Sequence, residues 1–122
     1  MTPSPLITKE MAGTVTVLAL GPQCAQINDP LLDPLSTELL DHVRGAVPPL
    51  VALDLSATEF FGSGFIEVLL RAFRELQKRP GAKMAICGLQ TYCREVLEIT
   101  HLDQLWPLPA TRGEAVAQLL AE

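Results

Sequence analysis

Hydrophobic and polar positions follow two periods along this chain, one close to two residues and one close to 3.6. Thr14–Leu20 alternates with the shorter period, and Leu6–Met11 precedes it across Ala12 and Gly13. This spacing predicts a β-hairpin at the start of the chain. Both faces of Thr14–Leu20 carry apolar residues, so we expect this strand to be covered on both sides.

Two later runs, Leu50–Leu55 and Ala82–Cys87, are almost wholly apolar. Such runs are typical of central strands that are buried on both faces. Between them the longer period predicts an amphipathic helix from about Gly64 to Arg79, with a broad apolar stripe opposite a charged face. Pro80 and Gly81 then end this helix.

The segments around these elements complete an α/β order. Gly21–Pro34 is rich in Pro, Asn and Asp and is predicted to be a loop. Leu105–Leu108 is predicted to be a short edge strand, limited by Pro107 and Pro109. Three further helices are expected, at Leu35–Arg44, near Gln90–Thr100 and at Arg112–Ala121.

Strands that alternate with helices over the last two-thirds of the chain predict the fold class. We expect a single α/β domain with a mixed, largely parallel sheet, an N-terminal β-hairpin and about four helices. A length of 122 residues suffices for one hydrophobic core. Residues 1–5 are predicted to be a flexible N-terminus, and residues 6–122 to form the domain.

Charge and cysteine content narrow the classes of function. The net charge is −5 and the sequence pI is about 4.9, which disfavours nucleic acid and anionic membrane surfaces and leaves a basic protein partner compatible. No apolar run approaches the roughly 20 residues needed to span a bilayer, so we expect no membrane insertion. Three cysteines without a CxxC pair, and a start without signal-peptide features, predict a soluble cytoplasmic protein with no disulfide framework.

Signatures of catalysis are few. His42 and His101 have no nucleophile or carboxylate placed beside them by a motif, and we expect Cys87 to be buried in the core. Cys93, on a helix after a loop, is expected to be exposed. We therefore predict no enzyme activity, no catalytic residue, no metal and no cofactor. An enzyme or small-ligand binder that uses Cys93 or His101 is an alternative, which a deep polar pocket around either residue would support.

Ser63 is the main candidate for a functional side chain, because it lies close to the N-terminus of the long amphipathic helix. As an N-cap its hydroxyl would accept a backbone hydrogen bond and contribute about 1 kcal/mol. The same position also favours an acquired negative charge, which makes Ser63 a candidate phosphorylation site. Gly62 and Gly64 leave the hydroxyl accessible, and the residues alone leave both interpretations open.

Three consecutive motifs resemble those of a known family. They are Leu53-Asp-Leu-Ser56, Phe60-Phe-Gly-Ser-Gly64 and Ile66-Glu-Val-Leu-Leu70. Together they resemble the signature of the STAS domain, the family of anti-sigma factor antagonists. The resemblance continues through Gly81–Leu89, Arg94–Leu97 and Thr100–Trp106, and so covers roughly residues 6–121.

The resemblance implies a regulatory role. In the family the first serine of the loop accepts a phosphate, and by alignment that residue is Ser63. The unphosphorylated form binds a kinase-type anti-sigma factor and frees the sigma factor, and phosphorylation breaks the complex. The implied partner-binding residues around Ser63 are Ser56, Thr58, Glu59, Phe61, Gly62, Gly64 and Glu67.

The loop departs from the family pattern at three positions. Gly62 replaces the usual Asp, Gly64 replaces Ser or Thr, and Phe65 replaces Gly. These departures keep a second hypothesis open, in which Ser63 is a docking hydroxyl that is never phosphorylated. The domain would then be a constitutive scaffold subunit of a lipid-transport or stress-signalling complex. Weak association of two copies also stays open.

Overall fold

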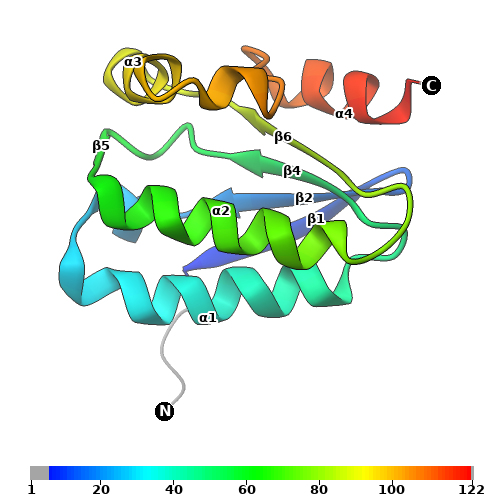
Figure 1. The fold of residues 1–122 in the computed structure, drawn as a ribbon, viewed down its shortest axis with the longest axis horizontal. Coiled ribbons are helices and arrows are strands. Elements are labelled where there is room, and N and C mark those ends of the chain that lie inside the picture. Colours follow the sequence, from blue (N-terminus) through cyan, green and yellow to red (C-terminus); the bar gives the residue numbers. More distant parts are fainter. Residues whose placement is uncertain (1–5, 122) are drawn as a thin grey trace.

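A four-stranded sheet forms the centre of the fold in the computed structural model, which describes residues 6–121 (Figure 1). The strand order is β1-β2-β4-β6, with an antiparallel β1–β2 pair and parallel β2–β4 and β4–β6 pairs. This confirms the predicted mixed, largely parallel sheet with an N-terminal hairpin. The four strands are β1 (Ile7–Ala12), β2 (Val15–Leu20), β4 (Leu50–Asp54) and β6 (Lys83–Cys87).

Four α-helices surround this sheet within the described residues, as the sequence predicted. α1 (Asp29–Gly45) and α2 (Ser63–Gln77) pack side by side against one face, and α4 (Arg112–Leu120) packs against the other (Figure 1). α3 (Thr91–Ile99) lies nearer the edge formed by β6 and contacts a short 3₁₀ turn, η2 (Leu102–Gln104).

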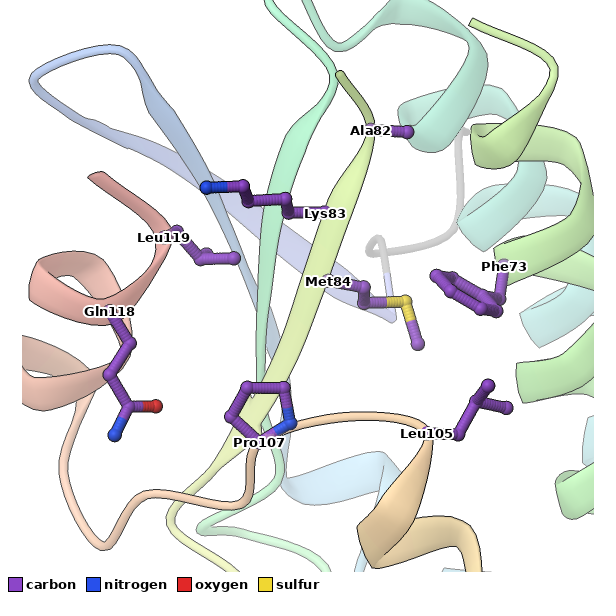
Figure 2. A pocket seen from close by; sticks show the side chains of 8 residues that line it. All are labelled: Phe73, Ala82, Lys83, Met84, Leu105, Pro107, Gln118 and Leu119. Carbon is purple, nitrogen blue, oxygen red and sulfur yellow. The ribbon is translucent and has the colours of Figure 1, made fainter. Parts of the chain in front are cut away.

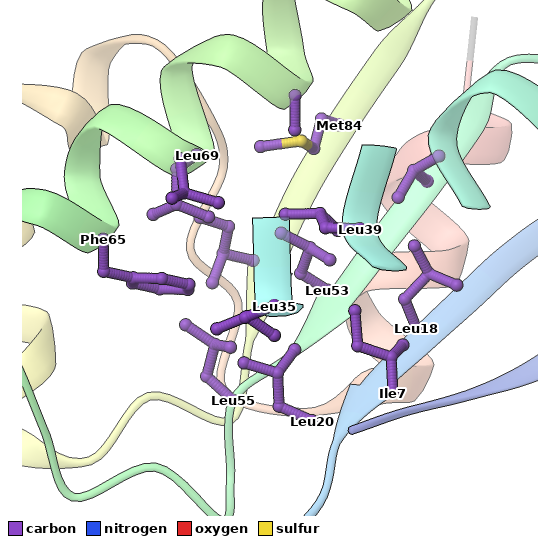
Figure 3. Close-up of a cluster of buried hydrophobic side chains, with 14 of the residues drawn as sticks. Ile7, Leu18, Leu20, Leu35, Leu39, Leu53, Leu55, Phe65, Leu69 and Met84 are labelled. Atoms are coloured by element: carbon purple, nitrogen blue, oxygen red, sulfur yellow. The ribbon is translucent and has the colours of Figure 1, made fainter. Parts of the chain in front are cut away.

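The hydrophobic core has two parts, one on each side of the sheet. The larger part lies between the sheet and α1 and α2, as Figure 3 shows, and the smaller part lies under α4. Leu18 and Leu20 of β2 belong to the larger part, whereas Val15 and Val17 belong to the smaller one. The prediction that this strand is covered on both sides is therefore confirmed.

The start of α1 corrects the prediction of a loop over Gly21–Pro34. The helix begins at Asp29 and includes Pro30 in its first turn and Pro34 in its interior. Pro30 costs no hydrogen bond there, because first-turn N–H groups have no partner within a helix. Pro34 does remove one such bond. Burial of Leu35 and Leu39 against the sheet offsets this loss, so tertiary packing overrides the local signal.

A second small sheet was not predicted. Within Gly21–Pro34, β3 (Gln26–Ile27) pairs in parallel with β5 (Phe60–Phe61), which directly precedes α2. Two residues are too few to give a periodic signal in the sequence.

The predicted edge strand at Leu105–Leu108 is wrong. This segment runs beside β6 but forms no strand, and a single backbone bond joins Ile86 N–H to the Pro107 carbonyl at 3.0 Å. Pro107 and Pro109 have no N–H groups, so neither can return a second bond to Ile86 and extend the ladder.

Candidate functional site

The loop between β4 and α2 is held in place by backbone hydrogen bonds from both sides. The amides of Glu59 and Phe60 donate to the Ala25 carbonyl at 2.7 and 3.1 Å, next to the β3–β5 pair. Leu55 N–H donates to the Cys87 carbonyl at 3.0 Å, so the other end of the loop is joined to β6. The start of α2 therefore has a fixed position at the carboxyl ends of the parallel strands.

Ser63 is the first residue of α2 and does not cap it. The N-cap residue is Gly62, whose carbonyl accepts a hydrogen bond from Phe65 N–H at 3.1 Å. Ser63 is exposed, and within residues 6–121 its hydroxyl makes no hydrogen bond. The capping interpretation is thus wrong, and an accessible hydroxyl stands at the start of the helix, where the amides of Ser63 and Gly64 have no partner within the helix.

The two glycines beside Ser63 differ in their surroundings. A Cβ on Gly62 would meet no atom within 4 Å, and Gly62 has a φ of −101°, so a larger residue fits there without strain. A Cβ on Gly64 would stand 2.5 Å from Leu32 Cδ1 of α1. Close packing between α1 and α2 therefore accounts for glycine at position 64 but not at position 62.

Two of the expected surface residues are buried. Phe61 is fully buried, and its ring centroid lies 5.1 Å from that of Phe65 in the core. Thr58 is fully buried as well. The expectation that the side chains of Thr58 and Phe61 face a partner is therefore wrong, because neither reaches the surface.

The other expected docking residues lie on the surface. Ser56, Glu59, Gly62 and Glu67 are exposed, and Gly64 is partly exposed. Their role in binding a partner stays a prediction, but these residues surround Ser63 along the loop and the first turns of α2.

Phe60 and Tyr92 form an exposed aromatic pair that the sequence analysis did not single out. Phe60 is 43% exposed and Tyr92, on α3, is 47% exposed. Their ring centroids are 5.4 Å apart and their planes differ by 24°, so the rings are stacked. Alternation along β5 could have indicated that Phe60 faces outward when Phe61 faces inward, but the contact with Tyr92 depends on tertiary structure.

Asp54, at the end of β4, anchors the base of the loop. Arg112 Nη2 donates to Asp54 Oδ2 at 2.8 Å, and the other carboxylate oxygen accepts a hydrogen bond from Ser56 N–H at 2.9 Å. Burial would raise the pKa of the Asp54 carboxyl, but the hydrogen bonds from Arg112 and Ser56 outweigh burial and hold the pKa below its usual value. Asp54 therefore anchors the end of β4 to the loop and to α4.

All three cysteines are buried free thiols. Burial raises the pKa of Cys24 and of Cys87 to about 11, and it raises that of Cys93 as well. The burial of Cys87 confirms one prediction. The expectation that Cys93 is exposed is wrong, because the thiol packs inward and lies 3.6 Å from the Thr58 carbonyl oxygen.

A pocket of about 220 Å³ lies away from the Ser63 loop, at the edge of β6 (Figure 2). It is largely apolar, and neither Cys93 nor His101 lines it, so it gives no support to the alternative that uses these residues. Lys83 supplies its one charged group, and the Lys83 ammonium donates to the Ala121 carbonyl at 2.8 Å. The lining residues are Phe73, Ala82, Lys83, Met84, Leu105, Pro107, Gln118 and Leu119.

Residues 6–121 contain neither a candidate metal site nor a candidate membrane span. No group of three or more His, Cys, Asp or Glu side chains in this range could hold a metal ion. In the same part of the chain, none of the helices has the length and apolar character needed to cross a membrane.

Comparison with protein families assigns this fold and loop to a known class. The model described as the STAS domain matches residues 15–115. The chain therefore belongs to the STAS domain family, which confirms the resemblance in the loop motifs. A comparison with curated protein sequences found no match.

Solved structures of anti-sigma factor antagonists share the fold. A STAS domain protein of this kind from Planctomyces limnophilus is 32% identical, with a TM-score of 0.83 over 93% of this chain and 96% of that one. An anti-sigma factor antagonist from Mycobacterium paratuberculosis is 23% identical, with a TM-score of 0.79 over 94% and 93% of the two chains. The Bacillus cell fate determinant SpoIIAA in its phosphorylated form is 18% identical, with a TM-score of 0.66 over 93% and 98%.

Proposed function

We propose that this protein is an anti-sigma factor antagonist that binds an anti-sigma kinase through the Ser63 loop and is released when that kinase phosphorylates Ser63. It acts in the cytoplasm as a binding module, without enzyme activity of its own. The observation that carries the proposal is the Ser63 hydroxyl, which is exposed and unbonded within the described chain at the start of α2.

The start of α2 is chemically suited to hold a phosphate. A phosphoserine carries a charge of about −1.5 to −2 at neutral pH, and the unpaired amides and dipole of a helix N-terminus stabilise such a charge. SpoIIAA, whose structure is known in a phosphorylated form, has the same overall fold. Because SpoIIAA is only 18% identical to this chain, the comparison shows a shared fold alone. Ser63 is therefore proposed as the phosphorylated residue on the geometry of this chain.

The proposed switch is the release of the partner when Ser63 is phosphorylated. It follows from the close approach of the partner that the loop permits. Gly62 carries no side chain, and a Cβ there would meet no atom within 4 Å, so a partner can pack directly against the backbone beside Ser63. A phosphate on Ser63 would fill this space and would bring a strongly hydrated charge into a packed contact. The exposed carboxylates Glu59 and Glu67 add like charge near it. Phosphorylation is therefore expected to break the complex.

Gly62 favours a second candidate function. The family's acidic residue is missing at this position, although a Cβ there would meet no atom within 4 Å. A kinase that recognises this acid would then fail to phosphorylate Ser63. In that case the domain is a constitutive scaffold subunit of a lipid-transport or stress-signalling complex, with Ser63 as a docking hydroxyl.

Intact-mass analysis separates the two functions. The purified protein and its Ser63→Ala variant are incubated with ATP and a lysate of the cells that naturally produce the protein. A gain of one phosphate in the wild type alone supports the switch. A stable complex with a co-purified partner, unaffected by ATP and with no phosphate on Ser63, supports the scaffold and contradicts the switch.

A matched set of variants then tests the mechanism. Ser63→Ala is expected to keep partner binding, and Ser63→Asp to weaken it. Ser63→Asn has nearly the size of Asp without its charge, so it separates the contribution of volume from that of charge. Equal affinities for the Ala and Asp variants would overturn the switch.

A further inference from the structure

The aromatic pair formed by Phe60 and Tyr92 has one feature that a purely structural contact does not need. The rings are stacked with their centroids 5.4 Å apart, so each covers part of the other. Nevertheless 43% of Phe60 and 47% of Tyr92 remain exposed. Aromatic surface is therefore left open to solvent close to Ser63, which lies three residues after Phe60.

The charges around this pair are acidic. Glu59 is exposed immediately before Phe60, and Glu95 is exposed one helical turn after Tyr92 on α3. Residues three apart in a helix lie on the same side, so Glu95 lies on the same side of α3 as Tyr92. The segment from residue 45 to residue 70, which includes the whole Ser63 loop, contains no lysine or arginine.

Two basic side chains on the neighbouring helices α2 and α3 are engaged elsewhere. Arg94, two residues after Tyr92, donates a hydrogen bond to the Leu108 carbonyl and lies 4.0 Å from Glu98. Arg71, two turns into α2, donates to the Ser36 hydroxyl at 3.4 Å. Among the described residues, neither guanidinium is stacked on the aromatic pair, whereas Glu59 and Glu95 next to it are exposed.

This combination selects one kind of ligand. A guanidinium or ammonium group is attracted to the face of an aromatic ring within about 6 Å of its centroid, and neighbouring carboxylates add to the attraction. Arginine is also enriched among the residues that dominate protein interfaces. Charge complementarity therefore points to a basic side chain on a protein partner.

We propose that Phe60 and Tyr92, together with the exposed carboxylates of Glu59 and Glu95, bind an arginine or lysine side chain of the protein that docks on the Ser63 loop. This inference rests on the proposed function, because it assigns the partner's chemistry at the same surface. The cation contacts the aromatic pair, whereas the backbone beside Ser63 receives the closely packed part of the partner. The two contacts are separable by mutation.

The direct test is a titration followed by NMR amide shifts at low salt. The probe is a short blocked peptide with two arginines, and its control is the same peptide with citrulline, which keeps the shape of arginine without the charge. The arginine peptide is expected to shift the amides of residues 59–63 and 91–95. Equal binding of the citrulline peptide, or shifts that avoid these residues, would overturn the proposal.

Variants of the pair give a second readout. Phe60→Leu and Tyr92→Leu keep an apolar side chain but remove the aromatic face, and each is expected to weaken binding of the arginine peptide about two- to fivefold. Ile99→Leu is the matched control, because Ile99 is exposed on the same helix further from Phe60. Unchanged affinity in both aromatic variants, with unchanged melting temperatures, would also overturn the proposal.

The two proposals fail in different ways. Ser63→Ala is expected to leave binding of the arginine peptide unchanged, because its hydroxyl is not part of the aromatic pair. If Ser63 is phosphorylated but the arginine peptide does not bind, only the aromatic site is wrong. If the peptide binds as expected but no phosphate appears on Ser63, the switch fails and the aromatic site stands.

Discussion

Gly64 of α2 lies directly against Leu32 of α1, so that a Cβ added to Gly64 would stand 2.5 Å from Leu32 Cδ1. Restoring the hydroxyl residue of the family at this position should therefore disturb the contact between the two helices. Gly64→Thr is expected to lower the free energy of unfolding by about 1 kcal/mol, because Leu32 is flexible enough to move partly aside. Urea unfolding of the variant measures this change.

A double-mutant cycle identifies the contact as the cause. In the Leu32→Ala background the clash is absent, so Gly64→Thr is expected to cost at least about 0.5 kcal/mol less than in the wild type. Additive effects of the two substitutions would show that the cost arises elsewhere in α2.

Restoring the family's acidic residue at Gly62 should be harmless to the fold. A Cβ there meets no atom within 4 Å, and Asp is a better N-cap than Gly, so Gly62→Asp is expected to raise stability by a few tenths of a kcal/mol. If an anti-sigma kinase acts on Ser63, the same substitution should also speed phosphorylation. Gly62→Asn is the control, since it caps the helix without adding charge. A loss of stability in both variants would contradict the finding that a side chain at position 62 meets no other atom.

Removal of Arg112 should destabilise the protein at neutral pH. Asp54 is buried and would lose its ion pair, so Arg112→Gln is expected to cost about 1–2 kcal/mol of the free energy of unfolding. Because the pKa of Asp54 is lowered in the fold, its contribution is present above the unfolded pKa and is lost as pH falls through the folded pKa.

NMR titration of Asp54 and unfolding measurements at several pH values check the effect of Arg112 on this carboxyl group. In Arg112→Gln the pKa of Asp54 should rise, because the hydrogen bond and charge of Arg112 no longer offset the effect of burial. The loss of stability on acidification below about pH 5 should also become smaller. An unchanged Asp54 pKa in the variant would contradict the role assigned to Arg112.

The three cysteines should be unreactive in the native state. Their thiols are buried and burial raises the pKa of each, so little thiolate is present near pH 8. A thiol-specific colour reagent should label none of them rapidly in buffer and all three in denaturant. Rapid labelling of Cys93 in buffer, located by peptide mass analysis, would contradict its burial beside Thr58.

The sequence predicted those parts of the fold that carry a repeated signal. The stripe of α2 and the apolar runs of β4 and β6 extend over enough residues to define a period. The β3–β5 pair and the start of α1 were missed, because two-residue strands have no period and Pro30 and Pro34 are strong loop signals.

At the candidate site the sequence located Ser63 but not all of its surroundings. Phe60 and Phe61 are identical in type, and only the pairing of β5 with β3 determines that Phe61 is buried and Phe60 exposed. Thr58 and Cys93 are similarly buried by contacts between distant segments. Burial at such positions depends on tertiary packing rather than on local residue preference.

The small β3–β5 sheet holds the end of the Ser63 loop that leads into α2. The hydrogen bonds from Glu59 and Phe60 to Ala25 attach the loop to a segment that lies outside the four central strands. Exposed positions around Ser63 can thus vary without altering the residues that stabilise the central sheet. During evolution, duplicated copies of such a domain could acquire new partners through a few surface substitutions while the same framework is inherited unchanged.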